Sequence, residues 1–233
     1  MWQALIQTLT DAVRAHPDIA LATSFAAEDM VITQAAHEAG LPIAVFTLDT
    51  GRLHVETLGM VERLRHHYGL VVEVFQPDPA AVTAHVAAHG AFAFYESLAL
   101  RKACCGIRKV EPLRRALAGR SAWITGQRRE QAVSRSALAV REDDGTFGLV
   151  KFNPLADWAE ADVWQEIRRR EIPYNPLHDA GYPSIGCDPC TRPVRAGEDP
   201  RAGRWWWEQA DQKECGLHAG NLGRVSAIGN RAA

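Results

Sequence analysis

The chain has 233 residues, of which 47% are hydrophobic and 23% are charged. This length and composition are typical of a globular protein that buries its own core without disulfide bonds. The formal net charge of −2 excludes a protein drawn to nucleic acid or anionic lipid by its overall charge, so any attraction to anions must come from local groups of arginine and lysine.

The first segment of the chain, residues 2–13, has apolar residues at helical spacing and predicts an amphipathic helix. It has neither the basic leader nor the apolar stretch of a signal peptide. No apolar run in the sequence approaches the ~20 residues of a membrane helix. We therefore expect a cytoplasmic protein that binds neither membrane nor nucleic acid. Cysteines in the cytoplasm are by default reduced thiols, metal ligands or catalytic groups.

Downstream, apolar runs alternate with helical patterns. Gly40 and Gly69 stand where helices are expected to end, and Asp157 stands where one is expected to begin, as its N-cap. Strands that alternate with helices are typical of an α/β fold with three layers and a mostly parallel sheet. The patterns predict strands at 18–25, 42–50, 70–77, 121–126 and 147–154, and helices at 28–40, at 54–69, over most of 79–119, and at 157–170.

After residue 170 the pattern changes, because prolines and glycines punctuate the chain. We expect an ordered but irregular C-terminal segment that wraps on the sheet. The sequence therefore predicts an α/β part at 1–170 and an irregular part at 171–233 that packs on the same domain.

Ligands of such sheets bind where the strands end, which directs attention to Ser24–Asp29, Asp49–Arg52 and Gly126–Glu130. In the first of these segments, Ser24 and Phe25 precede a helix whose free backbone N–H groups attract anions. The alternative is that Ser24 only caps that helix.

The second strand end carries a carboxylate. Asp49 is a candidate to bind a ribose or a base, together with Thr50 and Gly51 of the same turn. The alternative is that Asp49 only caps the turn after the strand.

The third strand end carries cations. Gly126 permits close approach, Arg128 and Arg129 bring two guanidinium groups to the ligand edge, and Arg135 follows within one or two helical turns. The alternative is an exposed, solvated arginine pair.

Cys104 and Cys105 are adjacent and lie within an expected helix. Residues three or four positions away share their face, so Arg101, Arg108 and Lys109 accompany the thiols. Such cations stabilise thiolates and offset the charge of a metal–thiolate centre. Taken alone, the pair favours the alternative of two small buried residues on an amphipathic helix.

A second pair, Cys187 and Cys190, forms C-x-x-C in a turn with Gly and Pro, a common half-site for metals. With Cys104 and Cys105 it makes four thiols. Neighbouring side chains on a helix diverge by ~100°, so one small ion would not readily bind both members of the first pair. An iron–sulfur cluster held by four cysteines is therefore favoured. Zinc, and thiols or a disulfide without metal, are the alternatives.

The fifth cysteine, Cys215, has no partner left. Lys213 and His218 lie close to it in sequence and would lower its pKa, which favours a nucleophile. An ordinary cysteine near the end of the chain is the alternative. Upstream, Arg201 and Arg204 are three residues apart and can face one anion.

Together these segments resemble assimilatory adenylyl-sulfate (APS) reductase, the iron–sulfur branch of the PAPS reductase family. The resemblance implies a Rossmann-like fold of the adenine-nucleotide α-hydrolase type. It makes 1–170 the nucleotide-binding domain and 171–233 a cluster-binding, catalytic segment. The matching segments are "SFAAED", "LDTGRLHVET", "KACCGIRKVEPL", "ITGQRREQ", "KFNPLADW", "GYPSIGCDPCT", "GRWWWE" and "KECGLH".

The resemblance also implies a [4Fe–4S] cluster on the two cysteine pairs. In the family, the cysteine of E-C-G-[LI]-H attacks the sulfur of APS, AMP leaves, and thioredoxin or a glutaredoxin-like thiol releases sulfite from the S-sulfocysteine. Carried over, Cys215 is the nucleophile, and Lys109 lies between cluster and substrate. Arg135, Arg201 and Arg204 hold the phosphosulfate. The other implied substrate-binding positions are Ser24, Phe25, Asp49, Thr50, Gly51, Gly126, Arg128 and His218.

Three other functions compete with this one. Reduction of PAPS, alone or beside APS, is the closest, but family members that act on PAPS usually lack the cluster cysteines. An ATP-pyrophosphatase of the same fold would carry S-G-G-x-D-S, which is absent at Ser24. A redox sensor without catalysis would leave Cys215 and the arginines unused. Formation of a homo-oligomer stays open.

Overall fold

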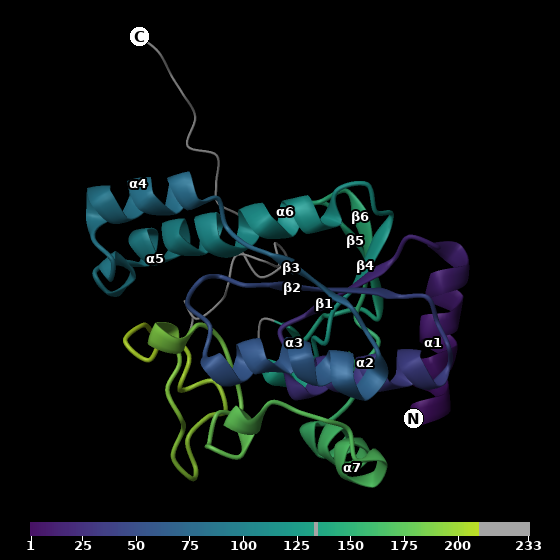
Figure 1. Cartoon of the computed structure of the whole chain (residues 1–233). Helices are drawn as coiled ribbons and strands as arrows, with labels where there is room; N and C mark the ends of the chain where they lie inside the picture. The colour runs from purple at the N-terminus through teal and green to yellow at the C-terminus, as the bar shows by residue number, and fades with distance from the viewer. Residues whose placement is uncertain (133–134, 210–233) are drawn as a thin grey trace.

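The computed structural model describes residues 1–132 and 135–209. A six-stranded sheet lies at its centre, in the order β3-β2-β1-β4-β6-β5 (Figure 1). All neighbouring strands are parallel except β5 and β6. The mostly parallel sheet is therefore confirmed. The strands are β1 (Ala20–Thr23), β2 (Ala44–Leu48), β3 (Val72–Phe75), β4 (Ala122–Ile124), β5 (Arg141–Asp144) and β6 (Leu149–Phe152).

Helices cover both faces of the sheet and make the expected three layers (Figure 1). The first three helices lie on one face, with α7 packed against α2, and the next three lie on the other. The first group is α1 (Trp2–Ala15), α2 (Ala27–Glu38) and α3 (Val55–Tyr68), with α7 (Glu160–Arg170); the second is α4 (Pro79–His89), α5 (Leu98–Cys105) and α6 (Glu111–Leu117).

Each face of the sheet buries its own apolar core. Leu9, Met30 and Leu64 are fully buried between the sheet and the first group of helices. Phe46 and Trp123 are buried on the opposite face. Burial of one large apolar side chain contributes ~1.5–3 kcal/mol. The two cores therefore hold the strands in place and determine where their carboxyl ends lie.

The position of β1 between β2 and β4 creates the site. From β1 the chain crosses to β2 on one side and later enters β4 on the other. The parallel register pairs Thr23 with Thr47 and Leu21 with Ile124, so the three carboxyl ends share one edge. The loops after β1, β2 and β4 therefore meet at a topological switch point, where ligands bind in open α/β sheets.

The expected elements are present, most of them with somewhat shorter bounds, while α1 extends to Ala15. One strand was not expected, and one expected cap is wrong. The edge strand β5 was not expected, because its sequence "REDD" shows no apolar alternation; charged side chains suit an exposed edge. Helix α7 has Ala159 as its N-cap residue, so the expectation of an Asp157 cap is wrong. Asp157 forms an ion pair with Arg129 instead.

After α7 the chain continues through irregular backbone and short 3₁₀ turns, among them η5 (Pro176–His178) and η6 (Asp188–Cys190). Ile172 and Leu177 are buried and fasten this part to the domain. Within residues 1–132 and 135–209, no helix has the length and apolar character needed to cross a membrane.

Candidate active site

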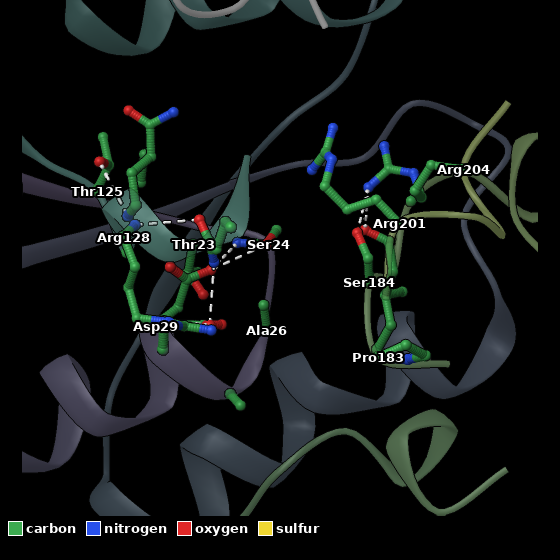
Figure 2. A pocket seen from close by; sticks show the side chains of 18 of the residues that line it. Thr23, Ser24, Ala26, Asp29, Thr125, Arg128, Pro183, Ser184, Arg201 and Arg204 are labelled. Atoms are coloured by element: carbon green, nitrogen blue, oxygen red, sulfur yellow. Dashed lines mark hydrogen bonds and ion pairs between the residues drawn. The ribbon is translucent and has the colours of Figure 1, made fainter. Parts of the chain in front are cut away.

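A pocket of about 500 Å³ opens at the carboxyl ends of β1, β2 and β4. One wall is formed by the loop after β1, the start of α2 and the loop after β4. The other is formed by the C-terminal part, with Pro183, Ser184, Arg201 and Arg204 (Figure 2). The volume lies within the ~300–1,000 Å³ that is usual for small-molecule sites.

The loop after β1 is held by Asp29. The backbone N–H and the hydroxyl of Ser24 donate to Oδ2 of Asp29 at 2.7 and 2.9 Å (Figure 2). The N-cap residue of α2 is Ala26, so Ser24 lines the pocket without capping the helix. Phe25 is fully buried, has a positive φ of 59° and is not among the pocket-lining residues. The bulky residue in that backbone region indicates a loop fixed by its surroundings.

Burial raises the pKa of Asp29 from 3.8 to about 6, although the bonds from Ser24 oppose the rise. Gly126 covers this carboxylate: a Cβ there would collide with Asp29 and lie 2.8 Å from Cβ of Glu28. Gly126 is therefore needed for the close approach of the β4 loop to the start of α2. This approach shapes one wall of the pocket.

The two arginines after β4 are not equivalent. Arg128 lines the pocket, but its Nε and Nη1 bind Glu28 and Glu130, each at 2.8 Å. Arg129 lies outside the lining and pairs with Asp157. The expected pair of free guanidinium groups is therefore absent among the described residues, and Arg128 holds the wall together. Arg135 does line the pocket.

Sequence reasoning did not single out Gln127, which lies between Gly126 and Arg128. It lines the pocket and is 5% exposed. Within the described part of the chain, neither the oxygen nor the nitrogen of its amide has a hydrogen-bond partner. A buried amide is costly without partners. Its donor and acceptor therefore suit the polar edge of a ligand. In the sequence, only its position directly after Gly126 could have indicated that Gln127 lies at the site.

Arg204 is fixed on the opposite wall. Its Nη1 donates to Oγ of Ser184 at 3.2 Å and to the carbonyl of Ile185 at 3.0 Å. Its guanidinium lies against Gly186, where a Cβ would be 2.7 Å from Cζ. Arg201 lines the same pocket. Two of the three expected phosphosulfate arginines thus occupy one wall, opposite Arg128 and Asp29 (Figure 2).

The loop after β2 contributes Thr50 to the pocket, whereas Asp49 and Gly51 are not among its lining residues. The Asp49 carboxylate accepts the N–H of Gly51 at 2.9 Å and the amide of Gln76 at 2.8 Å. Its role in the structure is to close the turn. Thr50, besides lining the pocket, contacts the cysteine site, with its Oγ1 3.2 Å from Sγ of Cys187.

The four paired cysteines line a second, smaller cavity of about 20 Å³. Cys104 and Cys105 come from the end of α5, and Cys187 and Cys190 from the turn around η6. Segments about 80 residues apart in sequence therefore meet at one site, as 187 − 105 = 82. Five cations border the same cavity: Arg52, Arg101, Arg108, Lys109 and Arg204.

A π-helical turn, η2 (Gly106–Val110), follows the adjacent cysteines, so the expectation of regular α-helical spacing there is wrong. Such turns widen a helix and are frequent at functional sites. Arg108 is buried and its Nη1 donates to the Thr50 carbonyl at 2.7 Å. Lys109 lines both cavities. Both neighbouring cations therefore border the cysteine cavity, and Lys109 also borders the larger pocket.

Burial, together with the neighbouring Cys187, raises the pKa of the Cys190 thiol to about 12. Burial likewise raises the pKa of Cys104. As free thiols these groups are protonated at neutral pH, so a metal would have to displace their protons. Among the described residues, no three His, Cys, Asp or Glu side chains surround a single metal position. Cys215 and His218 lie outside the described residues.

Comparison with known proteins shows the family to which the chain belongs. Residues 18–193 match the phosphoadenosine phosphosulfate reductase domain. The chain is 58% identical over 212 residues to an adenosine 5′-phosphosulfate reductase of Burkholderia cepacia, with 91% of this chain and 85% of that protein covered. It is 54% identical over 215 residues to the protein of that name from Allochromatium vinosum, covering 92% and 84%.

Solved structures agree on the fold. The phosphoadenylyl-sulfate (PAPS) reductase of Candida auris superposes with a TM-score of 0.70 at 28% identity, covering 82% of this chain and 90% of that one. An FMN adenylyltransferase of Candida glabrata gives a TM-score of 0.57 at 12% identity, covering 91% and 76%. The second likeness concerns the fold alone, and the Rossmann-like expectation is confirmed.

The buried carboxyl of Asp29 predicts a pH-dependent effect of the Asp29→Asn substitution. Between pH 3.8 and about 6 the folded protein keeps this proton, whereas the unfolded chain has lost it. The protonated carboxyl therefore stabilises the folded state of the wild type, and this stabilisation is lost as the pH rises through about 6. The rise of the pKa corresponds to ~3 kcal/mol. We therefore expect the Tm of the Asn variant minus the Tm of the wild type to be several degrees larger at pH 7.5 than at pH 4.5, as measured by thermal unfolding. A difference in Tm that does not change with pH contradicts this account.

Proposed function

Because the chain belongs to the phosphoadenosine phosphosulfate reductase family, we propose that it reduces adenosine 5′-phosphosulfate (APS) to sulfite and AMP, as a cytoplasmic enzyme of sulfate assimilation. One observation carries the proposal: Lys109, Arg204 and Trp205 each line both the nucleotide-sized pocket and the four-cysteine cavity. A cationic wall shared by two such sites suits an anionic nucleotide beside a thiolate-bound centre.

The nucleotide part of APS is proposed to lie against the wall formed by the loops after β1 and β4. Ser24, Thr50 and Gly126 border that space, and the Gln127 amide supplies a donor and an acceptor for the polar edge of a base or ribose. The phosphosulfate is proposed to lie toward Arg201, Arg204 and Lys109, with Arg135 at the same pocket. Guanidinium forks bind such oxygens in pairs and need no metal for it.

The cysteine cavity is proposed to hold a [4Fe–4S] cluster. Four sulfur donors line one small space, two from α5 and two from the C-x-x-C turn, and sulfur is the usual ligand of such clusters. Cations around the space offset the negative charge of the cluster and its thiolates. When bound, the cluster would supply a compact negative charge and a link between α5 and the C-terminal part.

The reaction is proposed to proceed in two thiol steps. The Cys215 thiolate forms a bond to the sulfur of APS while the bond from that sulfur to the phosphate oxygen breaks, and AMP leaves. One thiol of an external dithiol, thioredoxin or a glutaredoxin-like protein, then attacks Sγ of Cys215, the bond from Sγ to the sulfonate sulfur breaks, and sulfite leaves. The second thiol attacks the mixed disulfide, which releases Cys215 as a thiolate and leaves the dithiol oxidised to a disulfide. Lys109 and the arginines stabilise charge that develops on the phosphate and sulfonate oxygens. Lys213 and His218, close to Cys215 in sequence, are proposed to favour its thiolate and the bound substrate.

In this proposal residues 1–170 form the nucleotide-binding domain, and residues 171–233 bind the cluster and carry the nucleophile. Reduction of PAPS, alone or beside APS, is the second candidate. The name borne by relatives of more than half identity supports APS.

The test of the activity compares APS and PAPS at equal concentration, with sulfite measured in the presence of thioredoxin. We expect sulfite from APS, and a Cys215→Ser variant that binds APS but forms no sulfite, because the hydroxyl is too weak a nucleophile at neutral pH. Preferred use of PAPS would overturn the substrate assignment. Sulfite release that persists in the Ser variant would remove Cys215 from its role.

The test of the cofactor is the metal content of protein purified without oxygen. We expect about four irons and four sulfides per chain, as the proposed cluster requires. Cys187→Ser should lose most of this iron, and Cys215→Ser serves as the matched control that retains it. Protein that contains one zinc, or metal loss that is equal in both variants, contradicts the cluster.

A further inference from the structure

The segment Arg204–Glu208, here called the tryptophan strap because three of its residues are tryptophans, borders both cavities. Arg204 and Trp205 line the nucleotide pocket and the cysteine cavity alike. The N–H of Trp205 donates to the carbonyl of Cys190 at 3.1 Å, and Arg204 forms a β-bridge with Thr191. The start of the strap is therefore bound to the C-x-x-C turn.

Two arginines pack on the ring of Trp205. Its side chain is 1% exposed, and the guanidinium carbons of Arg101 and Arg204 lie over its ring at 4.4 and 4.7 Å from the centroid. Its φ is 40°, in the left-handed region that a bulky residue rarely adopts. Such backbone persists only where the surrounding contacts determine it, and it is concentrated at functional sites.

Glu208 binds the far end of the strap to the helix of the adjacent cysteines. Its two carboxylate oxygens accept from Nε and Nη2 of Arg101, each at 2.8 Å. The side chains of Arg101 and Glu208 are 1% and 6% exposed. Arg101 precedes Cys104 by three residues and borders the cysteine cavity. A buried cation needs a partner, and the parallel pair of bonds fixes its orientation.

We propose that Glu208 and Trp205 are positioning residues for the reaction. Glu208 fixes Arg101, Arg101 and Arg204 lie over the ring of Trp205, and these contacts hold the Arg204 guanidinium at the sulfonate end of the pocket. This inference rests on the proposed function.

A positioning role leaves a signature that a merely structural role does not. AMP has no sulfonate, so a displaced Arg204 should weaken the binding of APS and spare that of AMP. General loosening of the domain would instead weaken both ligands, because the β1 and β4 loops hold the nucleotide part. The preference for APS over AMP is therefore the quantity to measure.

The experiment introduces Glu208→Gln into the cluster-loaded Cys215→Ser protein, in which APS binds without turnover. We expect the Kd for APS to rise about tenfold, as for a loss of ~1.4 kcal/mol, while the Kd for AMP stays within about twofold and the iron content is unchanged. Glu198→Gln is the matched control, because Glu198 forms a bidentate pair with Arg192 that is only about one-third exposed on each side. That control should leave both Kd values unchanged.

Equal weakening of APS and AMP, or no change in either, would overturn the inference. If Glu208→Gln loses its iron, the same ratio is measured in Arg101→Lys, which keeps the charge and breaks the fork. An unchanged ratio there also overturns it. Failure of the parent enzyme to form sulfite from APS is a separate result that would contradict the proposed function itself.

Discussion

The cationic wall between the two cavities is the constraint on which the rest of the structure depends. Lys109, Arg204 and Trp205 face the nucleotide pocket on one side and the four cysteines on the other. Cations concentrated in so small a volume repel one another, and partial burial strengthens that repulsion. The proposed function accounts for this arrangement, because it places anionic groups on both sides: a thiolate-bound cluster in one cavity and a phosphosulfate in the other.

The fold holds this wall through contacts between distant parts of the chain. The switch point between β1 and β4 gathers the strand-end loops. Arg108 then binds the Thr50 carbonyl, and Thr50 contacts Cys187, so the loop after β2 is fastened to the cysteine site. Glu208 binds the tryptophan strap to Arg101 of α5. A displacement of the cysteines is therefore expected to displace residues of the pocket, because a few short, buried contacts connect the two.

Much of the fold could be predicted, because apolar periodicity identifies buried strands and helices directly. Elements without that signal could not: β5 is a charged edge strand, and the π-helical turn after Cys105 has no apolar pattern that distinguishes it from an α-helix. The cysteine pairs were recognisable from their spacing. The partners of individual side chains were not, since Arg128 binds Glu28, a residue 100 positions away, and Asp49 is used within its own turn. Local sequence shows which groups are present at a strand end and does not show which are already paired.

The central claim is that the two cavities act as one unit, and ligand linkage tests it most directly. Iron is extracted by a chelator from the cluster-loaded Cys215→Ser protein, with and without saturating APS, and the rates are compared. The shared wall predicts that bound APS slows the extraction several-fold, because it holds Lys109, Arg204 and the strap against the cysteine site. Extraction at the same rate with and without APS would contradict the account.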